Sequence, residues 1–264
     1  MENETSKNYT LITGSSAGTG KQFAVECAKR GFNLFLVSLP DTGLESFSEE
    51  LKNTYPIVVH HLSIDLRKKN SPQKVFDYAQ KNNLIIDILI NNAGLGFNGK
   101  LEDSSIELID TMISLNLRAS TLLTFLFIPE MKKLKKAYIL NISSFAALSP
   151  LPNKSVYAAT KTYLLFLTQA LSNELKDTGI SITSVHPNGI SSERAIEIIK
   201  KSSFIARLAT LTPAQVAKIS LDNMFAKNVF VIPGVVNKFY YYIGCSLPHG
   251  IILKIIGNIF KKTT

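Results

Sequence analysis

Residues 13–20 read TGSSAGTG and directly follow the short apolar run YTLIT at 9–13. An apolar, β-branched run that ends in a glycine-rich loop predicts a strand that turns into a helix. Gly14 permits the tight turn, Gly18 lets the backbone approach a pyrophosphate, and Gly20 lets the helix pack closely. Free amide groups at the start of such a helix bind phosphates. This stretch therefore predicts a dinucleotide site at the first strand–helix junction.

The rest of the chain alternates in the same way. Six further apolar runs are predicted as strands: LFLVSL (34–39), IVVHHLSI (57–64), DILI (87–90), AYILNIS (137–143), ISITSVH (180–186) and VFVI (229–232). Amphipathic stretches are predicted as helices at 19–30, 71–82, 105–134, 155–177, 193–208 and 213–226. Near-continuous apolar runs are typical of strands that are buried on both faces. The sequence thus predicts an α/β fold, with a doubly wound, mainly parallel sheet of about seven strands and helices on both faces.

Composition and charge are those of one globular domain with a basic end. The 264 residues are 45% hydrophobic and 19% charged. We expect a flexible N-terminal tail at 1–8 and a single nucleotide-binding domain at 9–264, in which 193–264 form a substrate cover and a C-terminal extension. The formal net charge is +9, and from Glu193 onward ten Lys and Arg residues stand against three Asp and Glu residues. This excess would attract acidic ligands or anionic membrane surfaces, and a merely solvated basic face is the alternative, whereas no nucleic-acid recognition motif is present.

The cysteine and histidine residues point away from two other kinds of site. Cys27 and Cys245 lack metal-ligand spacing, and the polar N-terminus lacks an apolar signal segment. Both cysteines are therefore expected to be free thiols of a cytoplasmic protein. The four histidines are scattered, so we predict no metal site and no Ser–His–acid triad.

Further motifs follow the glycine loop. In chain order they are Gly-x-x-x-Gly-x-Gly at 14–20, Ile-Asp-Leu at 64–66, Asn-Asn-Ala-Gly at 91–94, Ser144, and Tyr-x-x-x-Lys at 157–161. This set resembles the short-chain dehydrogenase/reductase family over about residues 8–195. The resemblance implies a Rossmann fold and a nicotinamide-dependent oxidoreductase.

The resemblance also implies the residues of the site. Those that bind the cofactor would be Gly14, Ser16, Gly18, Thr19, Gly20, Ser38, Asp65, Leu66, Asn92, Ala93, Gly94, Tyr157, Lys161, Pro187, Ile190 and Ser192. The catalytic residues would be Asn116, Ser144, Tyr157 and Lys161. In the family, the Asp65 side chain and the Leu66 amide bracket the adenine, and the turn at 91–94 lies along the cofactor.

Tyr157 and Lys161 are four residues apart on a predicted helix and therefore share a face. A free phenol has a pKa of about 10, which a nearby ammonium and the positive nicotinamide ring would lower. Tyr157 can then give a proton to the forming alkoxide, or take one in the reverse direction. The resemblance adds that Lys161 holds the nicotinamide ribose and that Ser144 binds the substrate oxygen.

Asn116 lies on a predicted apolar stripe with Ile109, Met112 and Ile113. A polar residue on a buried stripe must be hydrogen-bonded. The family places here a fourth catalytic residue, which anchors a water molecule that relays protons to the lysine. A purely structural asparagine is the alternative.

At two places the sequence departs from the family's pattern. Thr19 replaces an aliphatic residue beside the pyrophosphate. Asn188 replaces a glycine after Pro187, and asparagine tolerates a positive φ; contact of its side chain with substrate is the alternative. Ile190 and Ser192 keep the residue types that meet the nicotinamide carboxamide.

The residues near the ribose 2′ position favour NADP over NAD, which stays the alternative. An acidic residue at the end of the second strand would bind the ribose hydroxyls and select NAD, but Ser38 stands there. The basic residues that often mark NADP enzymes of the family are absent, since Leu39 and Ala17 occupy their positions. Ser38 can donate to a 2′-phosphate, and Arg67 or Lys68 would reach the same area.

The C-terminal region is expected to cover the substrate. Residues 239–242 and 251–260 are apolar with flanking lysines. Three interpretations stay open: a subunit interface, a cover for a lipophilic substrate, and peripheral contact with a membrane surface, of which we favour the first two. By resemblance, the helices at 105–134 and 155–177 would build a homodimer or homotetramer.

The leading hypothesis is an NAD(P)-dependent oxidoreductase that transfers a hydride between nicotinamide and a carbonyl or secondary alcohol of a lipophilic small molecule. A 3-oxoacyl-thioester reductase of fatty-acid type is the first alternative, because a basic tail attracts an acidic carrier. A non-catalytic dinucleotide-binding sensor or scaffold is the second. The complete catalytic set argues against that one, since a sensor needs no proton relay.

Overall fold

The computed structural model describes residues 8–190 and 209–245 of the chain. Its centre is a seven-stranded sheet of order β3-β2-β1-β4-β5-β6-β7, in which all pairs are parallel. The strands are β1 (Asn8–Thr13), β2 (Asn33–Ser38), β3 (Val59–Ser63), β4 (Ile85–Asn91), β5 (Ala137–Ile142), β6 (Ile180–Val185) and β7 (Phe230–Val231). Each predicted strand is present, and the doubly wound α/β fold is confirmed.

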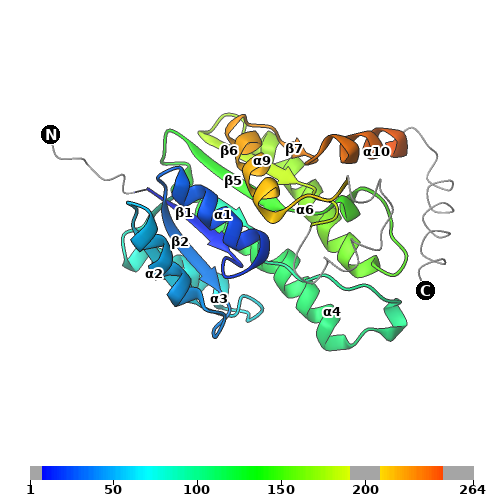
Figure 1. Ribbon diagram of the computed structural model, residues 1–264, viewed down its shortest axis with the longest axis horizontal. Helices are drawn as coiled ribbons and strands as arrows, with labels where there is room; N and C mark the ends of the chain where they lie inside the picture. Colours follow the sequence, from blue (N-terminus) through cyan, green and yellow to red (C-terminus); the bar gives the residue numbers. More distant parts are fainter. Residues whose placement is uncertain (1–7, 191–208, 246–264) are drawn as a thin grey trace.

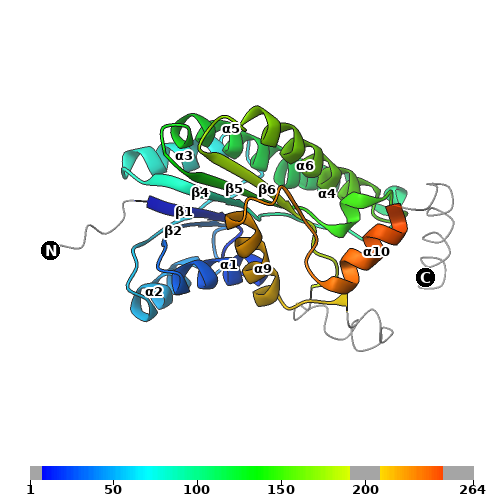
Figure 2. The same cartoon turned by 90° about the horizontal axis from the view of Figure 1, so that it is seen from above.

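Helices cover both faces of this sheet (Figure 2). On one face lie α1 (Gly18–Lys29), α2 (Leu44–Thr54) and α9 (Pro213–Phe225), and on the other lie α3 (Ser71–Lys81), α4 (Ile106–Met112), α5 (Ser120–Met131) and α6 (Ser155–Glu174). Two short 3-10 helices, η1 (Leu101–Asp103) and η3 (Phe145–Leu148), and a π-helix, η2 (Ile113–Ala119), complete this part. α10 (Val235–Cys245) lies at the opposite end of the molecule from α2 (Figure 1).

The strands are buried because helices pack on both sides of them. Every residue of β2 and β5 is buried. Successive side chains of a strand point to opposite faces, so Leu36 belongs to the core on the side of α1 and α2, while the adjacent Phe35 belongs to the core on the other side and stacks on Tyr78 of α3. This explains why the runs are apolar throughout and show no polar alternation.

The predicted helix at 105–134 is a helical run with a π-helical segment in its middle. By length and composition, Ile106–Met131 is apolar enough to cross a membrane, with a mean hydropathy of 1.4. However, α5 packs against the sheet and α3, and its residues Leu123 and Phe127 are almost fully buried. These contacts are those of a core helix of an α/β domain.

The structure contains two helices that were not predicted from the sequence, α2 and α10. It also moves the boundary between the N-terminal tail and the domain by one residue. Asn8 was assigned to the N-terminal tail, but it begins β1 and donates a hydrogen bond from Nδ2 to Asp87 Oδ2 at 3.0 Å. Residues 1–7, the predicted helix at 193–208, and the segment 251–260 lie outside the described residues.

The order of the sheet reverses direction at β1. The chain proceeds outward from β1 to β2 and β3, and then returns to β4 on the other side of β1. Loops at the carboxyl ends of β1 and β4 therefore diverge, which leaves a crevice where ligands of such sheets bind.

Candidate active site

A cleft with a volume of about 410 Å³ lies at the carboxyl ends of the strands. It brings together twelve of the predicted site residues: Gly14, Gly18, Thr19, Gly20, Asn92, Ala93, Gly94, Ser144, Tyr157, Lys161, Pro187 and Ile190. They come from the β1–α1 loop, the turn after β4, the end of β5, α6 and the end of β6. These five parts of the chain thus meet at one edge of the sheet.

The glycine loop has the backbone that its sequence predicts. Gly14 and Gly18 have φ angles of +65° and +54°, which side chains rarely adopt. A Cβ on Gly20 would lie 2.0 Å from the Gly14 carbonyl oxygen, so this position admits only glycine without a shift of the backbone. A Cβ on Gly18 would meet nothing within 4 Å and would project into the open cleft.

The turn after β4 holds the glycine loop in place. Asn92 donates from Nδ2 to the carbonyl oxygens of Thr13 and Gly14, at 2.9 and 3.2 Å. Thr13 Oγ1 in turn accepts the amides of Asn92 and Ala93, both at 3.0 Å. Behind it, Asn91 Nδ2 donates to Asn141 Oδ1 at 2.9 Å. The two loops therefore form one rigid floor.

The residues predicted for the adenosine end do not line the cleft itself but lie together at the ends of β2 and β3. The hydroxyls of Ser16 and Ser38 are 2.6 Å apart. Asp65 is paired with Arg67, whose guanidinium hydrogen bonds hold the pKa of the carboxyl below its usual range. Leu66 is buried in the core, so only its main chain is available to a ligand.

Tyr157 and Lys161 lie on one face of α6, as predicted. Lys161 is buried and donates from Nζ to the Ile142 carbonyl oxygen at 2.8 Å. Its Nζ lies 5.9 Å from the centre of the Tyr157 ring. Tyr157 is hydrogen-bonded to Ser144, which begins η3.

The expected effect on the Tyr157 pKa has the opposite sign in this structure. Burial raises the pKa of the phenol, and the hydrogen bond with Ser144 offsets only part of that rise. Burial also lowers the pKa of Lys161 to about 8, so most of this side chain still carries its positive charge near neutral pH. That the lysine, together with a bound nicotinamide ring, lowers the Tyr157 pKa therefore stays a prediction for the complex with the cofactor.

The buried lysine makes stability depend on pH. Its pKa is about 8 in the folded protein and 10.5 ordinarily. Between these values the unfolded chain binds more protons, so this group makes the folded state more stable as the pH rises from about 8 to 10.5. Relative to Lys161→Met, the wild-type free energy of unfolding should increase over that window, measured by urea denaturation. Lys176→Met removes an exposed lysine, so the difference in free energy of unfolding between the wild type and this variant should not change over the same pH range.

A difference between the wild type and Lys161→Met that does not change with pH would contradict the burial of Lys161.

Asn116 is completely buried and lies in the π-helix η2. It accepts the Leu95 amide at Oδ1 and donates from Nδ2 to the Leu95 carbonyl, both at 2.8 Å, and to Thr160 Oγ1 at 3.1 Å. A Cβ on Gly94 would lie 3.1 Å from Asn116 Oδ1 and 3.2 Å from Lys161 Nζ, so the three residues meet. The side chain thus fixes the loop after β4 beside the lysine, and a role in a water relay stays a prediction.

The stripe on which Asn116 was placed is not continuous. Ile113 is 43% exposed, although Met112 and Asn116 are buried. The π-helix adds a residue to the turn and rotates the chain after Met112, so the α-helical spacing breaks down.

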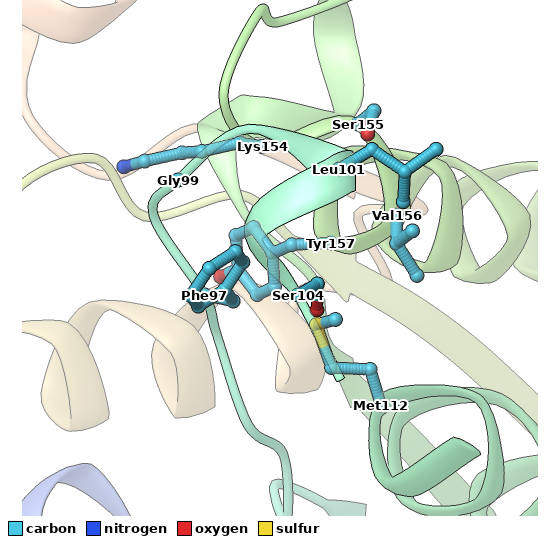
Figure 3. A pocket seen from close by; sticks show the side chains of 9 residues that line it. All are labelled: Phe97, Gly99, Leu101, Ser104, Met112, Lys154, Ser155, Val156 and Tyr157. Carbon is cyan, nitrogen blue, oxygen red and sulfur yellow. The ribbon is translucent and has the colours of Figure 1, made fainter. Parts of the chain in front are cut away.

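A small hollow adjoins the ring of Tyr157. Figure 3 shows it between the loop after β4, η1, α4 and the start of α6, with Phe97, Ser104 and Met112 beside the Tyr157 ring. Its volume of about 10 Å³ is that of a single water molecule. Ser104 Oγ is buried there and has no hydrogen-bond partner among the described residues.

His186 is a buried support of the site and provides no base for Ser144. Its Nδ1 lies 3.3 Å from the Ser144 carbonyl oxygen, not from the hydroxyl, and its Nε2 lies 3.0 Å from Ser184 Oγ. Burial lowers its pKa to about 4, so the ring is neutral. This geometry is that of a structural histidine.

The segment after β6 differs from expectation at Asn188. The residue is not among those with positive φ, so backbone conformation does not explain the asparagine. Its Nδ2 instead donates to Asn237 Oδ1 at 3.0 Å. Ile190 forms a parallel bridge with Leu211, and Ser192 lies outside the described residues.

Three supporting residues were not predicted: Thr13, Ser143 and Asn237. Ser143 Oγ donates to the Lys161 carbonyl at 2.8 Å and so fixes α6 to the end of β5. Thr13 and Ser143 are polar residues at the ends of apolar strands, directly beside motifs, and this position was a usable signal. Asn237 stands in an apolar stretch far from any motif and gave none.

The described residues contain no group of three His, Cys, Asp or Glu side chains that could hold a metal ion. Cys27 is a free, buried thiol whose pKa is raised by burial, so it is a core residue.

Comparisons with known proteins agree with this geometry. A family model described as short chain dehydrogenase matches residues 8–203. The very-long-chain 3-oxoacyl-CoA reductase of Homo sapiens is 29% identical over 259 residues, which cover 97% of this chain and 80% of that protein. A short-chain dehydrogenase from Sphingobium yanoikuyae in complex with NADPH is 27% identical, with a TM-score of 0.78 over 93% of this chain and 95% of that one. The bulky-bulky ketone specific alcohol dehydrogenase from Comamonas testosteroni is 25% identical, with a TM-score of 0.77 over 92% and 93% of the two chains.

Proposed function

Because this chain belongs to the short-chain dehydrogenase/reductase family of oxidoreductases, we propose that it reduces the carbonyl group of a lipophilic small molecule with NADPH. The observation that carries the proposal is the meeting of Ser144, Tyr157 and Lys161 at the cleft, where Tyr157 is hydrogen-bonded to Ser144. A phenol in this place can donate its proton to a forming alkoxide, as carbonyl reduction requires.

The cleft fits a nicotinamide dinucleotide. α1 begins without a side-chain cap and without an acidic residue in its first turn, so its first amides are available to phosphate oxygens. Gly18 leaves open space beside them. The bound cofactor would supply a hydride to the substrate carbon.

The chain's own residues would then act on the substrate oxygen. Ser144 donates a hydrogen bond that fixes the carbonyl for attack, and Tyr157 transfers its phenolic proton to the oxygen. Lys161, held by Ile142 and Ser143, keeps its ammonium beside Tyr157 and close to the place of the ribose. Asn116 keeps the loop after β4 in contact with this lysine.

The paired hydroxyls of Ser16 and Ser38 support NADPH over NADH. They are 2.6 Å apart at the ends of β1 and β2, where a carboxylate would select the ribose hydroxyls of NADH. The two hydroxyls carry no negative charge that would repel a 2′-phosphate, and each of them can donate a hydrogen bond to it. Arg67 is paired with Asp65, so the positive charge that it adds near this site is largely offset by that carboxylate.

Ser38→Asp should reverse the cofactor preference. The new carboxylate repels a 2′-phosphate and accepts hydrogen bonds from ribose hydroxyls, so the dissociation constant for NADPH should rise at least about tenfold relative to that for NADH. Ser38→Ala removes the hydroxyl without adding charge and should change the ratio much less. Fluorescence titrations of both cofactors measure it. Wild-type protein that binds NADH more tightly would contradict the assignment of NADPH.

A 3-oxoacyl thioester is the second candidate substrate class, favoured by the similarity to 3-oxoacyl-CoA reductases along nearly the whole chain. The excess of basic residues from Glu193 onward fits an acidic carrier. The test is NADPH consumption with long-chain 3-oxoacyl-CoA, bulky ketones and ketosteroids. A preference for the first would decide for the thioester, and turnover confined to the ketones would decide against it.

We also propose a homo-oligomer of a cytoplasmic protein. α5 and α6 lie on the same sheet face, and each leaves a phenylalanine exposed: Phe125 at 68% and Phe166 at 64%. Such a face fits a second copy of the chain. A monomer mass by light scattering would contradict this.

The exposed residues of α10 favour a role for this helix at a subunit interface or on a membrane surface over a role as a substrate cover. Val235, Phe239 and Tyr242 are 84%, 64% and 67% exposed, and no described residue of α10 lines the cleft. The spacing of these residues places them along one face of the helix.

A further inference from the structure

Asn237 of α10 joins three segments that lie near the cleft. The side chain is 1% exposed. Its Nδ2 donates to the carbonyl oxygens of Ala209 and Pro233, at 2.9 and 2.8 Å, and its Oδ1 accepts from Asn188 at 3.0 Å. All the polar atoms of this buried amide therefore have partners.

These contacts determine which way the Asn237 amide points. Two backbone carbonyl oxygens can only be satisfied by an amide nitrogen, since carbonyl groups do not donate. Oδ1 must therefore face Asn188, and only the Nδ2 of Asn188 can donate to it. The orientation of the buried Asn237 amide thus determines the orientation of the Asn188 amide.

The consequence is that Asn188 presents its oxygen, not its nitrogen, as the remaining polar atom. Asn188 is exposed and lines the cleft together with Tyr157, Pro187 and Ile190. Its Oδ1 has no hydrogen-bond partner among residues 8–190 and 209–245. The residue before it is tied to the catalytic loop, because the Pro187 carbonyl accepts the Phe145 amide at 2.8 Å.

We propose that Asn188 Oδ1 is a hydrogen-bond acceptor for an N–H or O–H donor of the bound ligand, and that Asn237 is the positioning residue that turns this oxygen toward the cleft. The inference rests on the proposed nicotinamide-dependent function. The donor has two sources, the carboxamide NH2 of the nicotinamide or an amide or hydroxyl group of the substrate. Both offer the same chemistry to a fixed carbonyl oxygen.

The cofactor source is tested by calorimetric titration of NADP+ and of its 3-acetylpyridine analogue, in which a methyl group replaces the NH2. Asn188→Ala should weaken NADP+ binding about three- to tenfold and leave binding of the analogue unchanged. Asn237→Ala frees Asn188 to rotate and should reduce the same ratio by a smaller factor. A merely structural role of Asn237 would weaken both ligands equally. Asn223→Ala, which removes an α9 amide that donates to the Ile219 carbonyl, should not change the ratio.

The substrate source is tested by steady-state kinetics of the same variants. A long-chain 3-oxoacyl-CoA offers amide N–H groups near its thioester, whereas a long-chain 2-ketone offers no donor. If the oxygen binds the substrate, Asn188→Ala should raise KM for the thioester and not for the ketone, with kcat nearly unchanged.

Two negative results have different meanings. Wild-type protein that binds neither NADP+ nor NADPH would overturn the proposed function, and this inference with it. Wild-type protein that binds NADP+, while Asn188→Ala changes neither the ratio of the two dinucleotides nor the ratio of the two KM values, would overturn this inference alone.

Discussion

Tyr157→Phe is expected to lower kcat for carbonyl reduction by about a thousandfold while the dissociation constant for NADPH changes less than about threefold. The reason is that the substitution removes one oxygen atom, and with it the proton that the forming alkoxide needs, which is typically a hundred- to ten-thousandfold effect. The ring that packs beside Gly96, at 3.4 Å from a Cβ built there, is kept. Steady-state kinetics and a fluorescence titration of NADPH separate the two quantities.

The matched control is a second tyrosine of the same helix. Tyr163 lies on α6, and its hydroxyl is 3.0 Å from Thr121 Oγ1. Tyr163→Phe removes the same atom from a site without substrate and should leave kcat within about twofold of wild type. If Tyr157→Phe kept a substantial rate, or lost it only together with NADPH binding, Tyr157 would not be the proton donor.

Gly20→Ala is expected to cause the second large effect, a loss of both stability and cofactor binding. The new Cβ would lie 2.0 Å from the Gly14 carbonyl oxygen and 2.5 Å from Asn92 Nδ2, and backbone at this junction cannot yield without breaking the bonds that hold the loop. Overpacking of this kind typically costs 1–3 kcal/mol, so the unfolding midpoint should fall by several degrees and NADPH affinity by at least about tenfold.

Gly18→Ala separates the clash within the protein from obstruction of the ligand. Its Cβ would meet no protein atom within 4 Å, and only its φ of +54° is unfavourable, at about 1 kcal/mol. It should weaken NADPH binding with a smaller loss of stability than Gly20→Ala. Equal stability of the wild type and Gly20→Ala in thermal denaturation would contradict the close contact of α1 with Gly14.

The parts that the sequence could predict are those in which spacing is read directly as geometry. The interval from Tyr157 to Lys161 is one helical turn, and both residues do share a face of α6. The glycines at 14, 18 and 20 require a particular backbone, and the structure has it. The apolar runs predicted all seven strands, because most residues of the central strands are buried on both faces and only apolar residues suit them.

Other features were within reach of the same reasoning. In α2, Leu44, Phe47, Ser48 and Leu51 are buried at helical spacing, a pattern that is present in the sequence. The Ser48 hydroxyl bonds the Leu44 carbonyl at 2.8 Å, which satisfies the polar group inside the stripe.

The spacing of residues in the sequence cannot predict long-range contacts, or the net effect of burial and charge on a pKa, because both arise only in the folded protein. The Tyr157 pKa depends on whether burial or charge dominates, and the sequence does not give burial at Tyr157 quantitatively. The π-helix at 113–119 has no marker in its residues, so the stripe that ended in Asn116 was drawn with the wrong period. The pairing of Asn188 with Asn237 joins residues 49 positions apart, and neither shows a motif.

The place of β1 in the sheet also bears on how the protein is made. It is synthesised before both of its neighbours in the sheet, yet it lies between them, with β2 on one side and β4 on the other. β2 can join it early, but the second edge stays open until Ile85–Asn91 have been synthesised and Asn8 can reach Asp87. Until then a nascent chain presents the unpaired edge of β1 around Leu11 and Ile12, which is the kind of surface that neighbouring chains bind and that chaperones protect. The pairing of β1 with β4, beside which the ligand crevice lies, can therefore form only after β2 and β3 have already been synthesised.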